Sequence, residues 1–172
     1  MDRYTERLVK GRPGSEAKLV FGLGILCVLG AIGLVVTGIM VKAIIAAIAL
    51  PVFVLGGFVI YYSLQLFQVE FEYLLTNGDI EISKIIAKKR RKVVREIRAE
   101  DIVRMSSLSN ERVRNDLSRV DSRRVEDYTA GEDKPYFVIE EKVKGTQYYY
   151  ILDLEGESEQ HMKEVLKTKV EK

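Results

Sequence analysis

The side chains that most often carry chemistry are scarce in this sequence. It contains one cysteine, Cys27, and one histidine, His161. A structural zinc site usually takes four cysteine or histidine ligands, and a hydrolytic triad needs a histidine between a nucleophile and a carboxylate. Cys27 falls inside a long apolar run, and His161 falls on the polar side of a predicted terminal helix, where we expect a surface residue. The sequence therefore predicts no catalytic residue of these kinds, no metal and no cofactor.

Carboxylate pairs are the remaining candidates for acid and base catalysis. They are Glu100-Asp101, Glu126-Asp127, Glu132-Asp133 and Glu140-Glu141. Neighbouring residues on a strand point to opposite faces, so adjacency in sequence does not make a catalytic pair. Phosphate-binding loops are also missing, because the glycines fall in apolar runs or singly in turns. We expect a protein that is not an enzyme and has no identifiable small-molecule substrate.

A basic run is the most distinctive polar feature. Residues 84–98 hold eight Lys or Arg and a single acid, whereas residues 99–172 hold 13 bases and 17 acids. Such a run binds nucleic acid, contacts anionic lipid, or only keeps a hairpin soluble and marks the cytoplasmic side of a membrane. No aromatic residue interleaves with it, so no nucleic acid is expected. The other two interpretations stay open. The candidate anionic-lipid contact is Lys88, Lys89, Arg90, Arg91 and Lys92.

Two uncharged runs precede the basic run. Residues 19–41 and 43–69 contain no charged side chain, and Lys42 alone separates them. One helix over both runs would be about 75 Å long, against a hydrocarbon core of about 30 Å. We therefore predict a transmembrane helical hairpin over 19–67, with spans at about 19–41 and 44–67. A buried soluble hairpin is disfavoured because such runs offer no polar surface, and a cleaved signal peptide because the first run is too long.

Basic residues on the flanks predict the orientation. Five precede the first span, Lys42 lies in the turn, and eight follow the second span within about 30 residues. The positive-inside rule then places both termini of a multi-pass membrane protein in the cytoplasm. Neither span contains an ionisable residue of the kind that lines ion paths, which argues against a pump or transporter.

Small residues recur in both predicted spans and permit close helix packing. They are Gly22, Gly24, Gly30, Gly33 and Gly38 in the first span, and Ala43, Ala46, Ala47, Ala49, Gly56 and Gly57 in the second. Packing of the hairpin on itself is the plainer use. The alternative is a homo-oligomer or a membrane-protein partner.

Alternating apolar and polar residues begin directly after the second span. Val69 to Thr76 predicts a strand, Asn77-Gly78 a type I′ turn, and Ile80 to Ile86 the returning strand. A second turn is expected at 87–90, and further strands around 93–97 and 102–105.

The remaining residues predict a helical or irregular insert, another hairpin and a final helix. In 106–133, Val113, Leu117 and Val120 hint at a short helix. Residues 136–143 and 146–154 predict a hairpin around Lys144-Gly145, and 157–170 an amphipathic helix. Residues 1–18 are expected to be a cytoplasmic N-terminal segment, and 68–172 a cytoplasmic α+β domain, mainly antiparallel β, with a C-terminal helix.

The residues after the second span carry a resemblance. Tyr73-Leu74-Leu75-Thr76-Asn77, Lys84-Ile85-Ile86, the basic run and Asp101-Ile102 resemble the opening hairpins of bacterial pleckstrin-homology-like domains over about 69–105. With its opening Met1-Asp2-Arg3-Tyr4-Thr5-Glu6, the chain resembles a family of small, uncharacterised two-span membrane proteins of Gram-positive bacteria. The resemblance implies a fold and a location in the bacterial cell membrane, and it brings no activity with it.

Two functional hypotheses follow. The first is a membrane-anchored interaction module that presents a cytoplasmic pleckstrin-homology-like (PH-like) domain to anionic lipid, to a protein partner, or to both. The second is an accessory or structural subunit of a larger membrane complex that acts through its transmembrane hairpin.

Overall fold

The computed structural model describes residues 4–40, 43–131 and 134–171. The chain divides into two compact units, which are described separately. One unit is Pro13–Gln68, and the other joins the residues up to Arg12 to those from Val69 onward. The turn around Lys42 and the pair Glu132-Asp133 lie outside the described residues.

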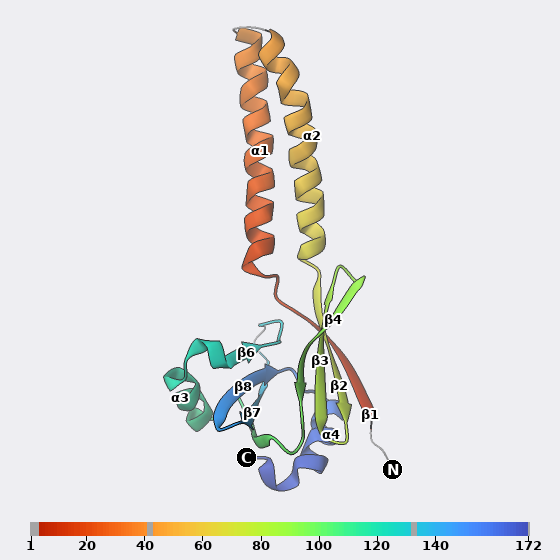
Figure 1. Ribbon diagram of the computed structural model, residues 1–172, viewed down its shortest axis with the longest axis vertical. Helices are drawn as coiled ribbons and strands as arrows, with labels where there is room; N and C mark the ends of the chain where they lie inside the picture. Colours follow the sequence, from red (N-terminus) through yellow and green to blue (C-terminus); the bar gives the residue numbers. More distant parts are fainter. Residues whose placement is uncertain (1–3, 41–42, 132–133, 172) are drawn as a thin grey trace. The chain divides into compact units, whose positions relative to one another are not determined.

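The unit Pro13–Gln68 consists of two antiparallel helices, α1 (Ser15–Met40) and α2 (Ala43–Leu66) (Figure 1). Both are long and apolar enough to cross a membrane. They meet closely at two glycines: a Cβ on Gly24 would lie 3.1 Å from the backbone nitrogen of Ile60, and one on Gly56 would lie 3.1 Å from that of Val28. The absence of a side chain at these two positions therefore sets the spacing of the helices.

The first sheet has the order β1-β2-β3-β4, and all its pairs are antiparallel. Its strands are β1 (Tyr4–Lys10), β2 (Val69–Thr76), β3 (Asp79–Ile86) and β4 (Arg90–Ile97). Asn77 and Gly78 have φ values of 52° and 96°, so the predicted turn with two positive φ angles is present.

Strand β1 was not predicted from the sequence. It lies at the edge of the first sheet, and its residues pair with β2 from Tyr4↔Thr76 to Lys10↔Glu70. Of the side chains that β1 turns toward the core, Thr5, Arg7 and Val9, only Val9 is apolar. The usual alternation of a half-buried strand is therefore invisible in the sequence. The expected N-terminal segment thus contributes a strand to the sheet.

The second sheet has the order β5-β7-β8-β6. Its strands are β5 (Ile102–Ser107), β6 (Val125–Asp127), β7 (Phe137–Val143) and β8 (Thr146–Leu152). Only β6 runs parallel to its neighbour, β8, and this three-residue strand was not predicted. The insert also forms α3 (Glu111–Arg119) and the short 3₁₀ helix η1 (Ser122–Arg124), and Val113 of α3 is buried against Val138 and Tyr149 of the second sheet. The predicted short helix is therefore present.

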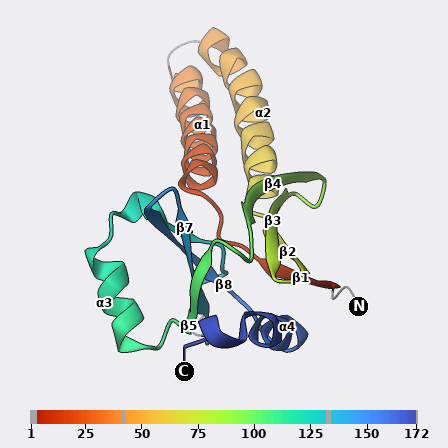
Figure 2. The ribbon, with the colours of Figure 1, turned by 60° about the horizontal axis from the view of Figure 1, so that its bottom comes forward.

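Helix α4 (Glu157–Leu166) and the 3₁₀ turn η2 (Lys167–Lys169) close the chain. In Figure 2 α4 lies beside the first sheet near β1. The predicted helix ran to Val170, but the α-helix ends at Leu166, where Lys167 takes a φ of 29°. The surface position predicted for His161 is wrong: the residue is 4% exposed, and its Nδ1 lies 2.9 Å from the Thr5 hydroxyl. The unpredicted strand β1 is what covers it.

The larger hydrophobic core lies between the sheets and under α4. Its fully buried side chains include Tyr73 and Ile82 from the first sheet, Ile139 and Tyr150 from the second, and Met162 from α4. The fold is α+β, with antiparallel-rich sheets and a C-terminal helix, as the sequence predicted.

Candidate functional site

The basic run forms the turn between β3 and β4. The Lys89 N–H donates to the Ile86 carbonyl at 3.1 Å, and the two central residues, Ala87 and Lys88, have φ values of 54° and 55°. The turn therefore has the two-residue geometry of Asn77-Gly78, but both central residues carry a Cβ. A residue other than glycine in this region costs about 1–2 kcal/mol. The basic side chains thus extend from a tight and strained turn.

Four of the five predicted contact residues are exposed and have no ion pair in the described part of the chain. Lys88, Lys89, Arg90 and Lys92 have exposed side chains, and none of them forms an ion pair with a side chain in the described ranges. We call these four residues the basic turn. Their charges are not neutralised by this part of the protein, so they are available to an external anion.

Arg91 differs from its neighbours. Its guanidinium forms an ion pair with the buried carboxylate of Glu72, and its Nε lies 3.4 Å from the Ser83 hydroxyl. Burial raises the pKa of Glu72, Arg91 lowers it, and the nearby Glu6 carboxyl raises it again, so that the pKa lies above its ordinary value. Arg91 therefore serves the sheet, although its place in the sequence suggested the same role as the other four.

Lys84 adds a charge that the predicted contact omitted. It lies on β3 directly opposite Lys92 in the register of the first sheet. Like charges at such positions repel each other and destabilise the pair. The register of this hairpin was the signal that could have identified Lys84. The alternation in the sequence predicts that register only to within a residue or two.

The basic turn lies at one particular end of the first sheet. Val69, the first residue of β2, pairs with Ile86, the last residue of β3, and Lys10 at the end of β1 pairs with Glu70. The Gly11 N–H also donates to the Val69 carbonyl at 2.8 Å. The basic turn therefore shares this end of the sheet with the two points where the chain passes to α1 and returns from α2 (Figure 1).

A comparison with known protein families matches residues 1–172 to the family described as bacterial PH-like domain (DUF6106). The chain belongs to this family. No curated protein and no solved structure matches it. The predicted resemblance is confirmed, and the match extends over the apolar helices as well as the sheets of the PH-like domain.

Polar side chains inside the PH-like domain form a network between the two sheets. Arg95 pairs with Glu126, which also accepts the hydroxyl of Tyr128, and Arg95 lies 5.3 Å from the ring centroid of Tyr150. The Tyr150 hydroxyl donates to Glu141 at 2.7 Å. Burial, reinforced by these carboxylates, raises the pKa of both tyrosines, so both stay protonated at neutral pH. Their hydrogen bonds satisfy buried groups, which is a structural role.

The fold gives the two carboxylates of Glu140-Glu141 different partners. Glu140 accepts a hydrogen bond of 2.9 Å from Arg104, whereas Glu141 accepts one from Tyr150. Within the described ranges, no group of three or more His, Cys, Asp or Glu side chains is placed to hold a metal ion.

Proposed function

We propose that this chain is a non-enzymatic, membrane-anchored interaction module whose PH-like domain contacts anionic lipid through the basic turn. The observation that carries the proposal is the shared end of the first sheet, where the basic turn lies next to both connections to the apolar helices. The lipid bilayer and its anionic headgroups are the proposed partners.

Exposure of the apolar helices supports the membrane anchor. Only 11% of the most apolar stretch of α1 and 17% of that of α2 are buried. The core helix of a soluble protein buries most of such a stretch, because exposed apolar surface is costly in water. Large side chains such as Leu19 (71% exposed) and Leu50 (70% exposed) instead suit a hydrocarbon environment.

Short connections support a position of the basic turn close to the bilayer. Two residues separate the end of α2 from β2, and four separate β1 from α1. At roughly 3.5 Å per residue, the shorter connection spans about 7 Å and the longer about 14 Å, so the shorter one stays within a Debye length of about 8–10 Å. Each basic residue near an anionic leaflet contributes about 1 kcal/mol, so four residues contribute about 4 kcal/mol. This contribution orients the domain, since the helices supply the anchoring.

The basic residues also determine the proposed orientation in the membrane. Their excess on both outer flanks of the hairpin supports a position of both termini in the cytoplasm of a bacterial cell. In a Cys27→Ser background, a cysteine beside Lys42 should react with an impermeant thiol reagent in intact cells, and one near Ser109 should not. Labelling near Ser109 would contradict the orientation and the lipid contact together.

The lipid contact is tested with the full chain in vesicles. A fluorophore on Val93→Cys, close to the basic turn, reports its distance from quenchers on the lipid headgroups. We expect stronger quenching in anionic than in neutral vesicles, and a loss of the difference at high salt because salt screens the attraction. Equal quenching in the two lipids would contradict the proposal.

Glycines on the hairpin surface favour a second candidate function, that of an accessory subunit acting through its helices. A Cβ added to Gly22, Gly30, Gly33 or Gly57 would meet no atom within 4 Å. These small residues therefore do not pack α1 against α2, and they leave a surface that another helix can approach closely. If Gly30→Leu with Gly33→Leu abolishes co-purification of a membrane complex while the lipid-dependent quenching persists, the second function is supported.

A further inference from the structure

No described element of the PH-like domain packs on the outer face of the first sheet, the side turned away from the core. The register aligns Leu8, Glu72, Ser83 and Val93 across all four strands of this face. Five large hydrophobic side chains are exposed in the described part of the PH-like domain. Three of these five, Tyr4 (61%), Leu8 (57%) and Val93 (44%), belong to this face. Such clustering is a mark of interaction surfaces.

Carboxylates surround the exposed apolar residues. Glu81 and Glu96 lie directly opposite each other on β3 and β4, and neither forms an ion pair with a described basic side chain. They line a groove of about 300 Å³ together with Tyr4 and Asp79. Arg98 also lines this groove, and its charge is paired with Glu100 at 3.6 Å. Opposed like charges destabilise the free sheet, and a cationic partner would remove that cost. We call this surface the acidic face.

A second surface, on α3 and η1, carries the opposite charge. It consists of the exposed side chains of Arg112, Arg114, Arg119, Arg123 and Arg124, here called the arginine surface. The insert, residues 106–133, holds five bases and seven acids. Asp116 binds Arg104 and Glu126 binds Arg95, which leaves Glu111 and Asp121 as the exposed carboxylates next to the arginines. Among the five arginines, only Arg112 has a described ion pair, with Glu171 at 3.7 Å. The fold therefore creates an arginine surface that the sequence composition hides.

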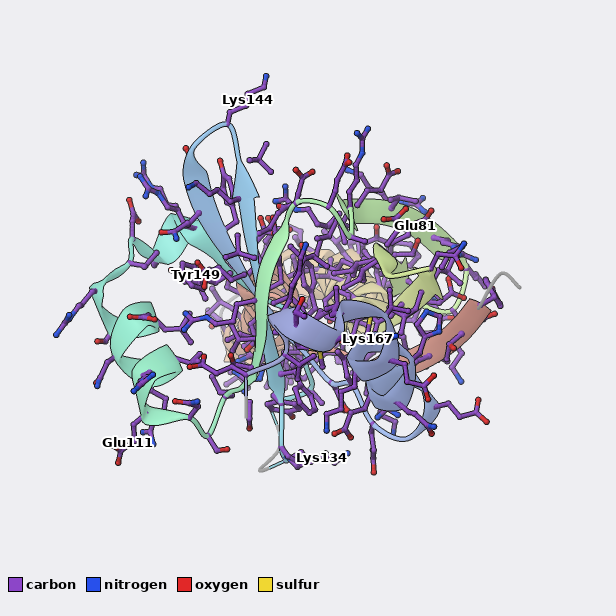
Figure 3. All side chains as sticks on the ribbon, turned by 90° about the horizontal axis from the view of Figure 1, so that it is seen from below. Glu81, Glu111, Lys134, Lys144, Tyr149 and Lys167 are labelled. Carbon is purple, nitrogen blue, oxygen red and sulfur yellow. The ribbon has the colours of Figure 1, made fainter. Side chains whose placement is uncertain are left out.

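The acidic face and the arginine surface lie on opposite sides of the PH-like domain. Figure 3 shows Glu81 on the first sheet and Glu111 at the start of α3 on opposite sides. The two surfaces therefore cannot meet within one chain. They can meet between two chains, and the pair then keeps one free surface of each kind, one on each chain.

We propose that the acidic face of one copy docks on the arginine surface of a second copy. Arginine forms paired hydrogen bonds with carboxylates, and its side chain also packs on apolar and aromatic residues such as Tyr4. An anionic bilayer is a poor occupant of the acidic face because the like charges repel. The contact is head-to-tail, so it extends into rows of copies unless its rotation closes a ring.

Thiol crosslinking between two populations of the full chain tests this contact. In a Cys27→Ser background, Thr76→Cys marks the groove of the acidic face and Ser118→Cys marks α3. Lys144→Cys, on the β7–β8 turn away from Glu81 and Glu111 in Figure 3, is the control. Mixed in vesicles at low protein density, the first two populations should crosslink with a short reagent at least about ten times more than either does with the control.

Charge reversal supplies the decisive comparison. Glu81→Lys with Glu96→Lys in the Thr76→Cys chain should reduce the crosslink about tenfold, and so should Arg114→Glu with Arg119→Glu in the Ser118→Cys chain. Mixing the two reversed chains should restore the crosslink. A misfolded variant could not restore it, so this comparison separates loss of the contact from loss of the fold. Crosslinking that survives both single reversals, or that the double reversal fails to restore, would overturn the proposal.

Discussion

At the residue scale, Arg90 and Arg91 show how neighbours in one turn take different roles. Adjacent residues on a strand project to opposite faces, so only Arg91 reaches Glu72 and Ser83 on the outer face of the first sheet. Arg90 remains exposed and unpaired within the described residues. The sequence identified the basic run, but the partner of Arg91 depends on strand pairing and could not be predicted from composition.

The raised pKa of Glu72 predicts a dependence of stability on pH. A raised pKa means that the folded state binds this proton more tightly than the unfolded state does. The stabilising contribution of Glu72 is therefore complete below its unfolded pKa of about 4.3 and is lost as the pH rises through the folded pKa.

The test of this prediction is a series of thermal melts of the full chain in detergent across that pH range. The stability of the parent relative to Glu72→Gln should fall as the pH rises. Glu70→Gln, on the same strand, controls for the loss of one carboxylate. A rise in the stability of the parent relative to Glu72→Gln with increasing pH would contradict the raised pKa.

Two turn glycines predict a graded loss of stability. Gly78 and Gly145 both have positive φ, 96° and 83°. A Cβ at Gly145 would meet no atom within 4 Å, whereas one at Gly78 would lie 2.7 Å from Val165 Cγ1 and 3.1 Å from Ala99 Cβ. Gly145→Val should therefore cost about 1–2 kcal/mol from the backbone alone. Gly78→Val should cost more because α4 must also shift. Equal melting temperatures of the two variants would contradict this account.

At the element scale, the strands that were predicted have local signals in the sequence. The strands that were not predicted lack such signals. β2 and β3 have alternating residues and an Asn-Gly turn, and β7 and β8 have a similar pattern around Lys144-Gly145. β1 and β6 lack such a signal, because β1 buries polar residues and β6 has three residues. Both depend on pairing with distant strands, which a single sequence does not reveal. The arginine surface was hidden because the ion pairs of Asp116 and Glu126 with distant arginines are not visible in the sequence either.

The helix pair offers a matched test of glycine packing. Gly24 lies against α2, whereas Gly33 lies in open space on the same helix. Gly24→Leu should force α1 and α2 apart and lower the melting temperature of the full chain in detergent, while Gly33→Leu should have little effect. If Gly33→Leu were the more disruptive, the described packing of the hairpin would be wrong.

At the scale of the whole molecule, the PH-like domain is discontinuous in sequence. The helices are inserted between β1 and β2, whose ends are adjacent. Arg7 of β1 also donates to the buried carboxylate of Asp153 at 2.7 Å. The N-terminal segment is therefore needed to complete the domain.

Two soluble chains test this dependence. Replacing residues 13–68 with a short glycine linker should leave a domain that unfolds cooperatively, because Gly11 and Val69 are hydrogen-bonded neighbours. A chain that begins at Gln68 lacks β1 and leaves Asp153 buried without Arg7, which costs about 3–5 kcal/mol. Circular dichroism should show a much lower melting temperature for the second chain, and equal melting temperatures would refute the role of β1.

The most direct test of the lipid contact compares two variants with the same loss of charge. In the full chain with the fluorophore at Val93→Cys, one variant changes Lys88, Lys89, Arg90 and Lys92 to Ser, and the other changes Arg114, Arg119, Arg123 and Arg124 to Ser. In anionic vesicles at low protein density, headgroup quenching should fall to its value in neutral lipid only in the first variant. An equal fall in both, or no fall in the first, would contradict the contact.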